Sequence, residues 1–250
     1  MFESTLPMGT PDLMRVSGFR RYLDEVAVRG PTGPASTRLS SLSPSLLDDL
    51  LRFERDGSGS ELLEVLAASL RHGRDLLIHL ELSGRVIPLT VFPSDRLAHC
   101  PLPPAQLLEA RLNALGVMHV EPALFKPPGH GKRSWVTDAS QYSPLGPLTW
   151  ELALRGAREA LLPELAGSAA YRVTPAADLQ ALNLSGSMAA AVVRLRRETT
   201  NLREIATWPG FDRGRAMRLL NALYLQAALI VSRTHPAATN EGWAGGALPF

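Results

Sequence analysis

His99 and Cys100 are the first candidates for chemistry, because Cys100 is the only cysteine in the chain and a histidine stands directly before it. A nucleophilic cysteine needs an imidazole close to its sulfur and a third group that orients the ring. Consecutive side chains of a strand point to opposite faces, so these two groups would diverge. We interpret Cys100 as a buried structural cysteine. A single cysteine also excludes an intrachain disulfide framework and a cysteine-rich zinc site.

The segment PPGHGKRSW, residues 127–135, contains the glycines and the lysine of a phosphate-binding loop but not their spacing. That loop requires a glycine, four residues and then Gly-Lys-Ser/Thr. Here Lys126 stands where the first glycine is needed, and Arg133 replaces the hydroxyl residue. Two interpretations remain: a solvated loop, or a contact for an acidic partner made by Lys132, Arg133 and Trp135.

Three histidines, His79, His99 and His119, fall on segments that we expect to be strands. Their spacing matches no local metal-binding motif such as H-E-x-x-H, and they are typical of core or surface positions on a half-buried sheet. The acidic residues mostly lie beside arginines on expected helix faces, which is ordinary surface pairing rather than a carboxylate pair for acid-base chemistry. We therefore expect no metal, no cofactor and no enzymatic activity.

The composition is that of a globular protein. The chain has 250 residues and a formal net charge of +2, and its 26 basic residues include only two lysines, Lys126 and Lys132. It is therefore no polycation, and the arginine bias is typical of a GC-rich genome. The N-terminus lacks the pattern of a signal peptide, and no apolar run approaches the ~20 residues of a membrane span. We expect a soluble, cytoplasmic bacterial protein that does not contact a membrane.

The elements around these residues predict an α+β protein of two small units. Residues 1–43 form a mobile arm or linker, because RGPTGPASTRLSSLSPS is rich in Gly, Pro and Ser; FRRYLDEVAV within the arm could be a helix or a strand. Residues 44–125 form a small mixed helix/antiparallel-sheet unit. Helical spacing is expected after Ser43 and again from Ser60 to the stop at Gly73.

Period-2 alternation then predicts two strands joined at Ser83-Gly84, followed by a third short strand, a helix and a fourth strand. Pro88 lacks a ladder donor, so its strand should lie at an edge or be bulged there. Residues 126–146 are a connecting loop, and residues 147–236 are mostly helical, including LTWELALRGAREALLPELAG and TPAADLQALNL. Residues 237–250 form a flexible tail, which Trp243 could turn into a docking segment.

The end of the helical unit has the order helix, short helix, turn, helix, strand. SGSMAAAVVRLRRETT is the first helix, NLREIATW the second, FDRGRAMRLLNALYLQ the third, and ALIVSRT the strand. Asn201 and Glu204 have the spacing of a capping box at the second helix. This order is that of a winged helix-turn-helix.

The outward positions of the third helix include Arg213, Arg215, Arg218 and Asn221. Residues 185–235 contain eight arginines against three acidic residues, and such a basic patch can neutralise phosphates. Against DNA binding, the expected wing has one arginine and no lysine, and Gly214 weakens the first turn of the helix. Met217 and Leu225, also expected on the exposed face, suit protein contact better than base edges.

The segment from Tyr171 to Arg233, above all NLREIATWPGFDRGRAMRLLNALYLQAALIV, resembles the C-terminal half of PATAN-type modules of bacterial signalling proteins. In that family a winged-helix half follows a small α+β half, and LLEVLAASLRHGRDLLIHLELSGRVIPLTVF would occupy the matching place. The resemblance implies a role through protein contact, in association with response regulators, motility or small-GTPase signalling, rather than catalysis.

We therefore expect a non-enzymatic regulatory or scaffolding protein of bacterial signalling that binds a protein partner. The residues expected at the contact are Arg213, Arg215, Arg218, Asn221, Lys132, Arg133 and Trp135. The alternative is a DNA-binding transcriptional regulator that uses the winged helix-turn-helix at 185–233. The sequence leaves the partner's identity and the oligomeric state open.

Overall fold

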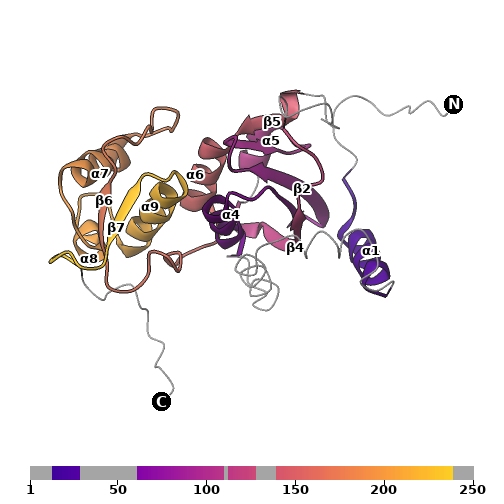
Figure 1. Ribbon diagram of the computed structural model, residues 1–250, viewed down its shortest axis with the longest axis horizontal. Helices are drawn as coiled ribbons and strands as arrows, with labels where there is room; N and C mark the ends of the chain where they lie inside the picture. The colour runs from indigo at the N-terminus through magenta and orange to yellow at the C-terminus, as the bar shows by residue number, and fades with distance from the viewer. Residues whose placement is uncertain (1–12, 29–60, 110–111, 128–138, 239–250) are drawn as a thin grey trace, which may run out of the picture.

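The computed structural model describes residues 13–28, 61–109, 112–127 and 139–238. It confirms the α+β class, with helices packed on an antiparallel sheet and a second, mostly helical part at the C-terminal end (Figure 1). None of the helices in these ranges is both long enough and apolar enough to cross a membrane.

The sheet has five strands in the order β4-β1-β2-β3-β5, and all neighbours are antiparallel. Its strands are β1 (Leu76–Leu82), β2 (Arg85–Phe92), β3 (Leu97–His99), β4 (Gly116–Pro122) and β5 (Tyr142–Pro144). Strands β1 and β2 form a hairpin on Ser83-Gly84, both with positive φ, as a two-residue turn requires. The first four strands were predicted. Strand β5 was not, because its three residues lie in the segment expected to be a connecting loop.

Strand β2 is an inner strand, but Pro88 has no partner on the side of β3. Pro88 is opposite His79 of β1, whereas the ladder between β2 and β3 begins only at Thr90. The missing N–H therefore interrupts no ladder on that side. The prediction of an edge or bulged strand is therefore wrong, because β2 is paired on both sides with no bulge, and Pro88 lies just outside its ladder with β3.

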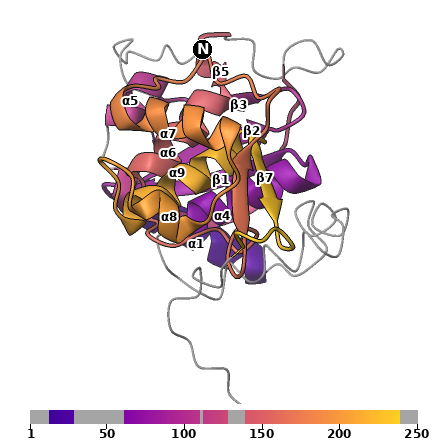
Figure 2. The same ribbon diagram turned by 90° about the vertical axis from the view of Figure 1, so that its left-hand side faces the viewer.

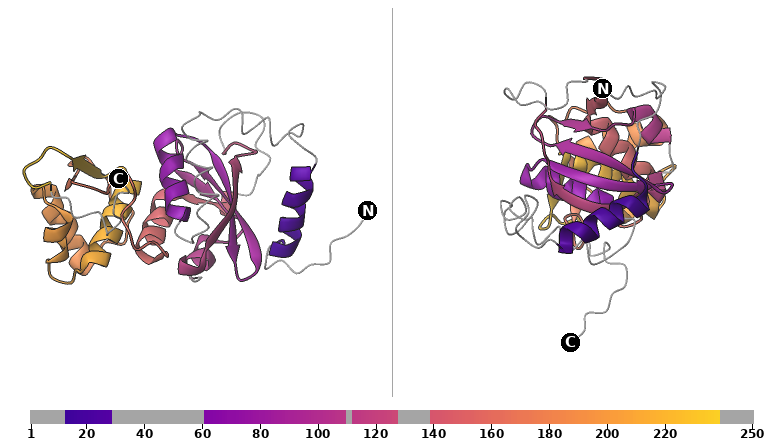
Figure 3. Two further views of the ribbon diagram at one scale, coloured as in Figure 1. Left: turned by 90° about the horizontal axis from the view of Figure 1, so that it is seen from below. Right: turned by 90° about the vertical axis from the view of Figure 1, so that its right-hand side faces the viewer.

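Helices cover one face of the sheet, shown in Figure 3 on the side towards the C-terminal part. They are α4 (Glu61–His72), α5 (Pro104–Glu109), the 3-10 turn η1 (Leu112–Ala114) and α6 (Leu145–Arg155); a second 3-10 turn, η2 (Ala139–Gln141), precedes β5. Helix α4 ends at Gly73, which has a φ of 59°, as its position after the last apolar residue predicted.

Helix α1 (Val16–Val28) lies on the opposite face of the sheet (Figure 3). Val16 and Phe19 pack on Val86 in a small hydrophobic cluster. Of the two alternatives for FRRYLDEVAV, a helix or a strand, the structure has the helix. The prediction of a mobile arm is wrong for residues 16–28, because apolar side chains spaced along the helix are buried against the sheet. Residues 1–12 and 29–43 of the arm, the helix expected after Ser43 and residues 239–250 of the tail lie outside the described residues.

The C-terminal part contains β6 (Ala170–Val173), α7 (Gly186–Arg197), α8 (Leu202–Ala206), α9 (Arg213–Leu225) and β7 (Leu229–Ser232), which face the viewer in Figure 2. The predicted order of three helices and a strand is confirmed. Strand β6, which was not predicted, pairs with β7, and Tyr171 also bridges to Thr200. Asn201 caps α8 as predicted, since its side chain accepts a hydrogen bond from the Glu204 amide at 2.9 Å.

Two stretches expected to be helical are not. Helix α6 stops at Arg155, where the Gly156 amide still bonds to the Leu152 carbonyl but the backbone turns extended. Beyond it, the Arg158 guanidinium binds the carbonyls of Ala160 and Leu161, and so stabilises a compact turn. Residues 174–184 also form turns and irregular structure rather than a helix.

One hydrophobic cluster runs through both parts, from Leu62 to Ala228. Helix α6 connects them, because it packs against α4 and α5 on one side and against α9 on the other. A partly buried ion pair adds to the contact between the two parts, in which Arg158 donates to Glu64 of α4. The core is therefore continuous across residues 126–146, where the sequence predicted the boundary between two units.

Candidate partner-binding surface

Helix α9 is the element that the sequence expected to present a binding face, and most of it is buried. It packs against α6 on one side and α8 on the other. Its buried residues are Ala216, Leu219, Leu220, Asn221, Ala222, Leu223 and Leu225. The exposed part of the helix is its first turn, which carries Arg213 and Arg215.

The four predicted contact residues of α9 therefore differ in their exposure to solvent. Arg213 and Arg215 are exposed, whereas Arg218 is half-buried and its Nη1 donates a hydrogen bond to the Leu154 carbonyl at 2.9 Å. Asn221 has no exposed surface: its amide oxygen accepts from the Leu162 N–H at 2.8 Å and its amide nitrogen donates to the Ala160 carbonyl at 2.9 Å.

The prediction of Asn221 as an outward contact residue is wrong, because its amide instead stabilises the turn that follows α6. The prediction that Leu225 is exposed is wrong for a similar reason, since this side chain belongs to the shared core. Lys132, Arg133 and Trp135 lie outside the described residues.

Four side chains form a continuous row over α7, the α8–α9 turn and the start of α9. The Arg194 guanidinium lies 4.5 Å from the centre of the Trp208 ring, and the Arg215 guanidinium lies 5.5 Å from that of Phe211. The two aromatic rings meet edge to face at 6.4 Å. We call Arg194, Trp208, Phe211 and Arg215 the arginine–aromatic row.

Local sequence explains how the row is held. Asp212 caps α9 by accepting the Arg215 amide at 2.7 Å, which fixes the first turn beside Phe211. Gly210 has a φ of 77°, and a Cβ built there would lie 3.0 Å from the Cβ of Ser187 on α7. A glycine thus provides both the left-handed turn and the close approach to α7. The signal for the row in the sequence was the pair of aromatic residues that flank Pro209-Gly210, in the turn expected between the second and third helices.

The row lies in a basic and partly apolar surface. Arg194 forms an ion pair with Glu198 four residues later on the surface. Val193, beside it on α7, is 49% exposed, whereas Trp208 is only 5% exposed. An arginine stacked on a ring keeps the donors at the edge of its guanidinium plane free for carboxylates. The surface can therefore combine charge pairing with apolar contact.

The described residues hold no comparable site for catalysis or a metal. The ring centres of His79 and His119 are 5.8 Å apart, and His79 Nε2 lies 3.1 Å from a Glu121 carboxylate oxygen. His99 is not part of this group, because it lies on β3 and contacts Gln141. No group of three histidine, cysteine or acidic side chains in this part of the chain could hold a metal ion.

Cys100 is buried, as expected for a structural residue. Burial raises the pKa of its thiol to about 11. The thiol therefore stays protonated near neutral pH, and a protonated thiol is a poor nucleophile.

No protein-family model, curated protein or solved structure gives a significant match to this chain.

Proposed function

We propose that this chain is a non-enzymatic regulatory or scaffolding protein that binds a protein partner through the arginine–aromatic row. The observation that carries the proposal is the burial of α9. This helix joins the two parts of the fold through α6, so that its central and C-terminal turns serve internal packing. On α9, the surface left for a partner is the first turn, where Arg215 of the row lies.

The composition of that surface favours protein over nucleic acid. Arginine is enriched among the residues that dominate protein-protein binding energies, and Arg194 and Arg215 are the exposed members of the row. Val193 adds exposed apolar area next to Arg194, which fits a partner with both acidic and apolar side chains. We therefore infer a partner segment in which carboxylates alternate with apolar residues.

The alternative, a DNA-binding regulator, retains one supporting observation. Arg213 and Arg215 are exposed on the first turn of α9, and in helix-turn-helix proteins the first residues of the third helix reach base edges. However, α6 lies along the helix beyond that turn, so a major groove would have to accommodate α6 as well. This packing favours the protein-binding proposal.

The assignment to bacterial signalling, and to a winged helix of the PATAN type, rests on the sequence resemblance. The order β6, α7, α8, α9, β7 is compatible with such a module. The protein-contact role that the resemblance implies agrees with the role proposed from the burial of α9.

The proposal can be tested with the full chain and charge variants of the row. Tagged wild-type protein and the double variant Arg194→Gln/Arg215→Glu are used to capture partners from a lysate of the source organism, with quantitative mass spectrometry. Arg20→Glu is the control, because the Arg20 side chain is exposed but lies on α1, on the opposite face of the sheet. We expect a partner that is retained by wild type and control and lost by the double variant.

Fluorescence anisotropy of a labelled random duplex, measured over a salt series, tests the alternative directly. A steep fall of affinity with salt, abolished in Arg213→Gln/Arg215→Gln, would replace the protein-binding proposal with DNA binding. Equal capture of every protein by wild type and the row variant would also contradict the proposal, because the row would then contribute nothing to binding.

A further inference from the structure

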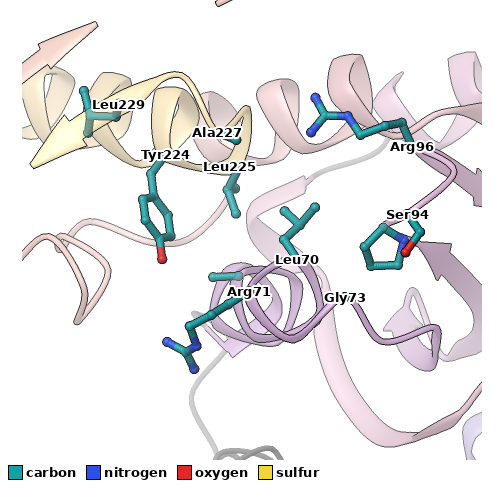
Figure 4. A pocket seen from close by; sticks show the side chains of 11 residues that line it. Leu70, Arg71, Gly73, Ser94, Arg96, Tyr224, Leu225, Ala227 and Leu229 are labelled. Carbon is teal, nitrogen blue, oxygen red and sulfur yellow. The ribbon is translucent and has the colours of Figure 1, made fainter. Parts of the chain in front are cut away.

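A cavity of about 450 Å³ lies where the two parts of the fold meet, away from the arginine–aromatic row. It is bounded by the end of α4, the turn between β2 and β3, the end of α9 and the start of β7 (Figure 4). Its size is within the ~300–1,000 Å³ typical of small-molecule sites. Such sites are mostly apolar, with a few polar groups that orient the ligand.

The apolar part of the cavity is formed by leucines from both parts of the fold. Leu70 comes from α4, Leu225 from α9 and Leu229 from β7. Figure 4 shows Leu70 and Leu225 between the Tyr224 ring on one side and Arg96 on the other. A hydrocarbon chain or ring lying on these leucines would contact both parts at once.

The charged groups of the lining are both basic. Arg71 is held in an ion pair with Glu164, which does not itself line the cavity. Arg96 is exposed, and its guanidinium makes no ion pair or hydrogen bond to the part of the chain that the structure describes. The Arg96 side chain extends from its turn towards the end of α9 (Figure 4). The described lining therefore presents an unpaired guanidinium beside an apolar floor, and carries no carboxylate.

Two residues of the lining have a backbone conformation that non-glycine residues rarely adopt. Arg96 and Ala227 have φ values of 56° and 54°, and the third such residue in the described ranges is Ser83 of the β1–β2 turn. Arg96 is held there by two backbone bonds, from its amide to the Pro93 carbonyl at 3.2 Å and from the Leu145 amide to its carbonyl at 2.8 Å. Such strain persists where surrounding structure enforces it, and it is concentrated at ligand sites.

At the cavity, the ends of α4 and α9 each use an amide beyond the helix to satisfy a carbonyl of the last turns. The Arg74 amide bonds to the Ser69 carbonyl at 3.1 Å, and the Ala228 amide bonds to the Leu223 carbonyl at 3.0 Å. Both helices thus close with the same Schellman arrangement, with Gly73 and Ala227 as the left-handed residues. The charge that the cavity presents is that of its arginines.

We propose that this cavity binds a small amphipathic carboxylate. Its carboxylate pairs with the Arg96 guanidinium, and its hydrocarbon part lies on Leu70, Leu225 and Leu229 and reaches the Tyr224 ring. An arginine is suited to this role, because its two parallel N–H groups match the two oxygens of a carboxylate. Because the ligand contacts α4 and the β2–β3 turn on one side and α9 and β7 on the other, its binding stabilises their packing.

The experiment titrates the full chain, with ¹³C-labelled alanine methyl groups, with decanoate, with decanol and with inorganic phosphate. Ala67 and Ala227 line the cavity and report binding, and Ala191 on α7 is the internal reference. We expect decanoate to shift the two cavity methyl signals in a saturable way and to leave Ala191 unchanged. Decanol, which lacks the charge, should bind at least about tenfold more weakly, and phosphate, which lacks the chain, should cause no shift.

Two variants of the cavity and one control variant distinguish the outcomes. Glutamine in place of Arg96 meets the same backbone constraint in the turn but has no charge, so Arg96→Gln should weaken decanoate binding about tenfold. Arg20→Gln on α1 should leave the binding unchanged. Leu229→Trp, which fills the cavity from β7, should abolish the methyl shifts. The proposal is overturned if decanol binds as well as decanoate, if Arg96→Gln has no effect, or if phosphate alone produces the same shifts.

Discussion

Replacing Asn221 with alanine should destabilise the protein strongly, because its amide satisfies two backbone groups of the turn after α6. The Leu162 N–H is buried and loses its acceptor, which corresponds to about 1–3 kcal/mol. The Ala160 carbonyl still accepts a hydrogen bond from Arg158 Nε and belongs to an exposed residue, so its share is smaller, about 0.5 kcal/mol. The lost side-chain volume adds about 1 kcal/mol in a fully buried position. We expect a total loss of about 3 kcal/mol in the free energy of unfolding.

Urea unfolding of the full chain, followed by circular dichroism, measures this loss. Asn183→Ala is the matched control, because Asn183 is exposed in a loop, and its free energy of unfolding should change by less than about 0.5 kcal/mol. An Asn221→Ala protein within 0.5 kcal/mol of wild type would refute the reasoning. Asn221 would then be a surface residue, as its sequence position predicted.

Asn221→Asp separates the two hydrogen bonds. An aspartate can still accept from the Leu162 amide, but when ionised it cannot donate to the Ala160 carbonyl, and its charge is buried. Burial raises the pKa of such a carboxyl, so the variant binds more protons folded than unfolded and loses stability as the pH rises above about 4. The difference in unfolding free energy between this variant and wild type should therefore be smaller at pH 4 than at pH 7.

Three further predictions concern the helix ends and two buried acids. Ala227→Gly should stabilise the protein by about 1 kcal/mol and Gly73→Ala destabilise it by a similar amount in urea titrations, because both positions require a left-handed backbone. Native Cys100 should react with a thiol reagent at pH 8 about two orders of magnitude more slowly than the denatured chain, since its pKa is about 11. Burial also raises the pKa of Tyr171, to about 12. At alkaline pH the folded state therefore keeps the protons of Cys100 and Tyr171 after the unfolded state has lost them. The unfolding free energy should thus fall from about pH 9 upwards, by up to ~1.4 kcal/mol per pH unit for each group, and Cys100→Ser should shift the onset to about pH 10.

Local signals predicted much of the fold. Alternating residues gave β1 and β2, and the Asn201–Glu204 spacing gave the cap of α8, because these features depend on neighbours in the chain. Strands β5 and β6 were missed because three or four residues carry little periodicity, and their partners are distant in sequence. The continuation of α6 beyond Arg155 was predicted wrongly, because the Asn221 amide, about 60 residues later in the chain, stabilises a turn there.

The candidate surface was predicted only in part. Arg213 and Arg215 are exposed as the sequence indicated, since they lie in the first turn of a helix. The burial of Asn221 could not be predicted, because it depends on the turn after α6, about 60 residues earlier, to which its amide is bonded. The leucines on either side of the cavity, Leu70 and Leu225, are likewise distant in sequence, and their meeting depends on the packing of α4 against α9.

Helix α1 has a consequence for the dynamics of the molecule. Its apolar cluster on the sheet is separate from the main core, and its backbone connection consists of bonds at the β1–β2 turn, from Val16 to Gly84 and from Val86 to Met14. Undocking α1 therefore exposes little of the core and does not require global unfolding. Amide hydrogen exchange should resolve α1 as a separate opening unit, with lower protection than β1 and β2, to which it docks.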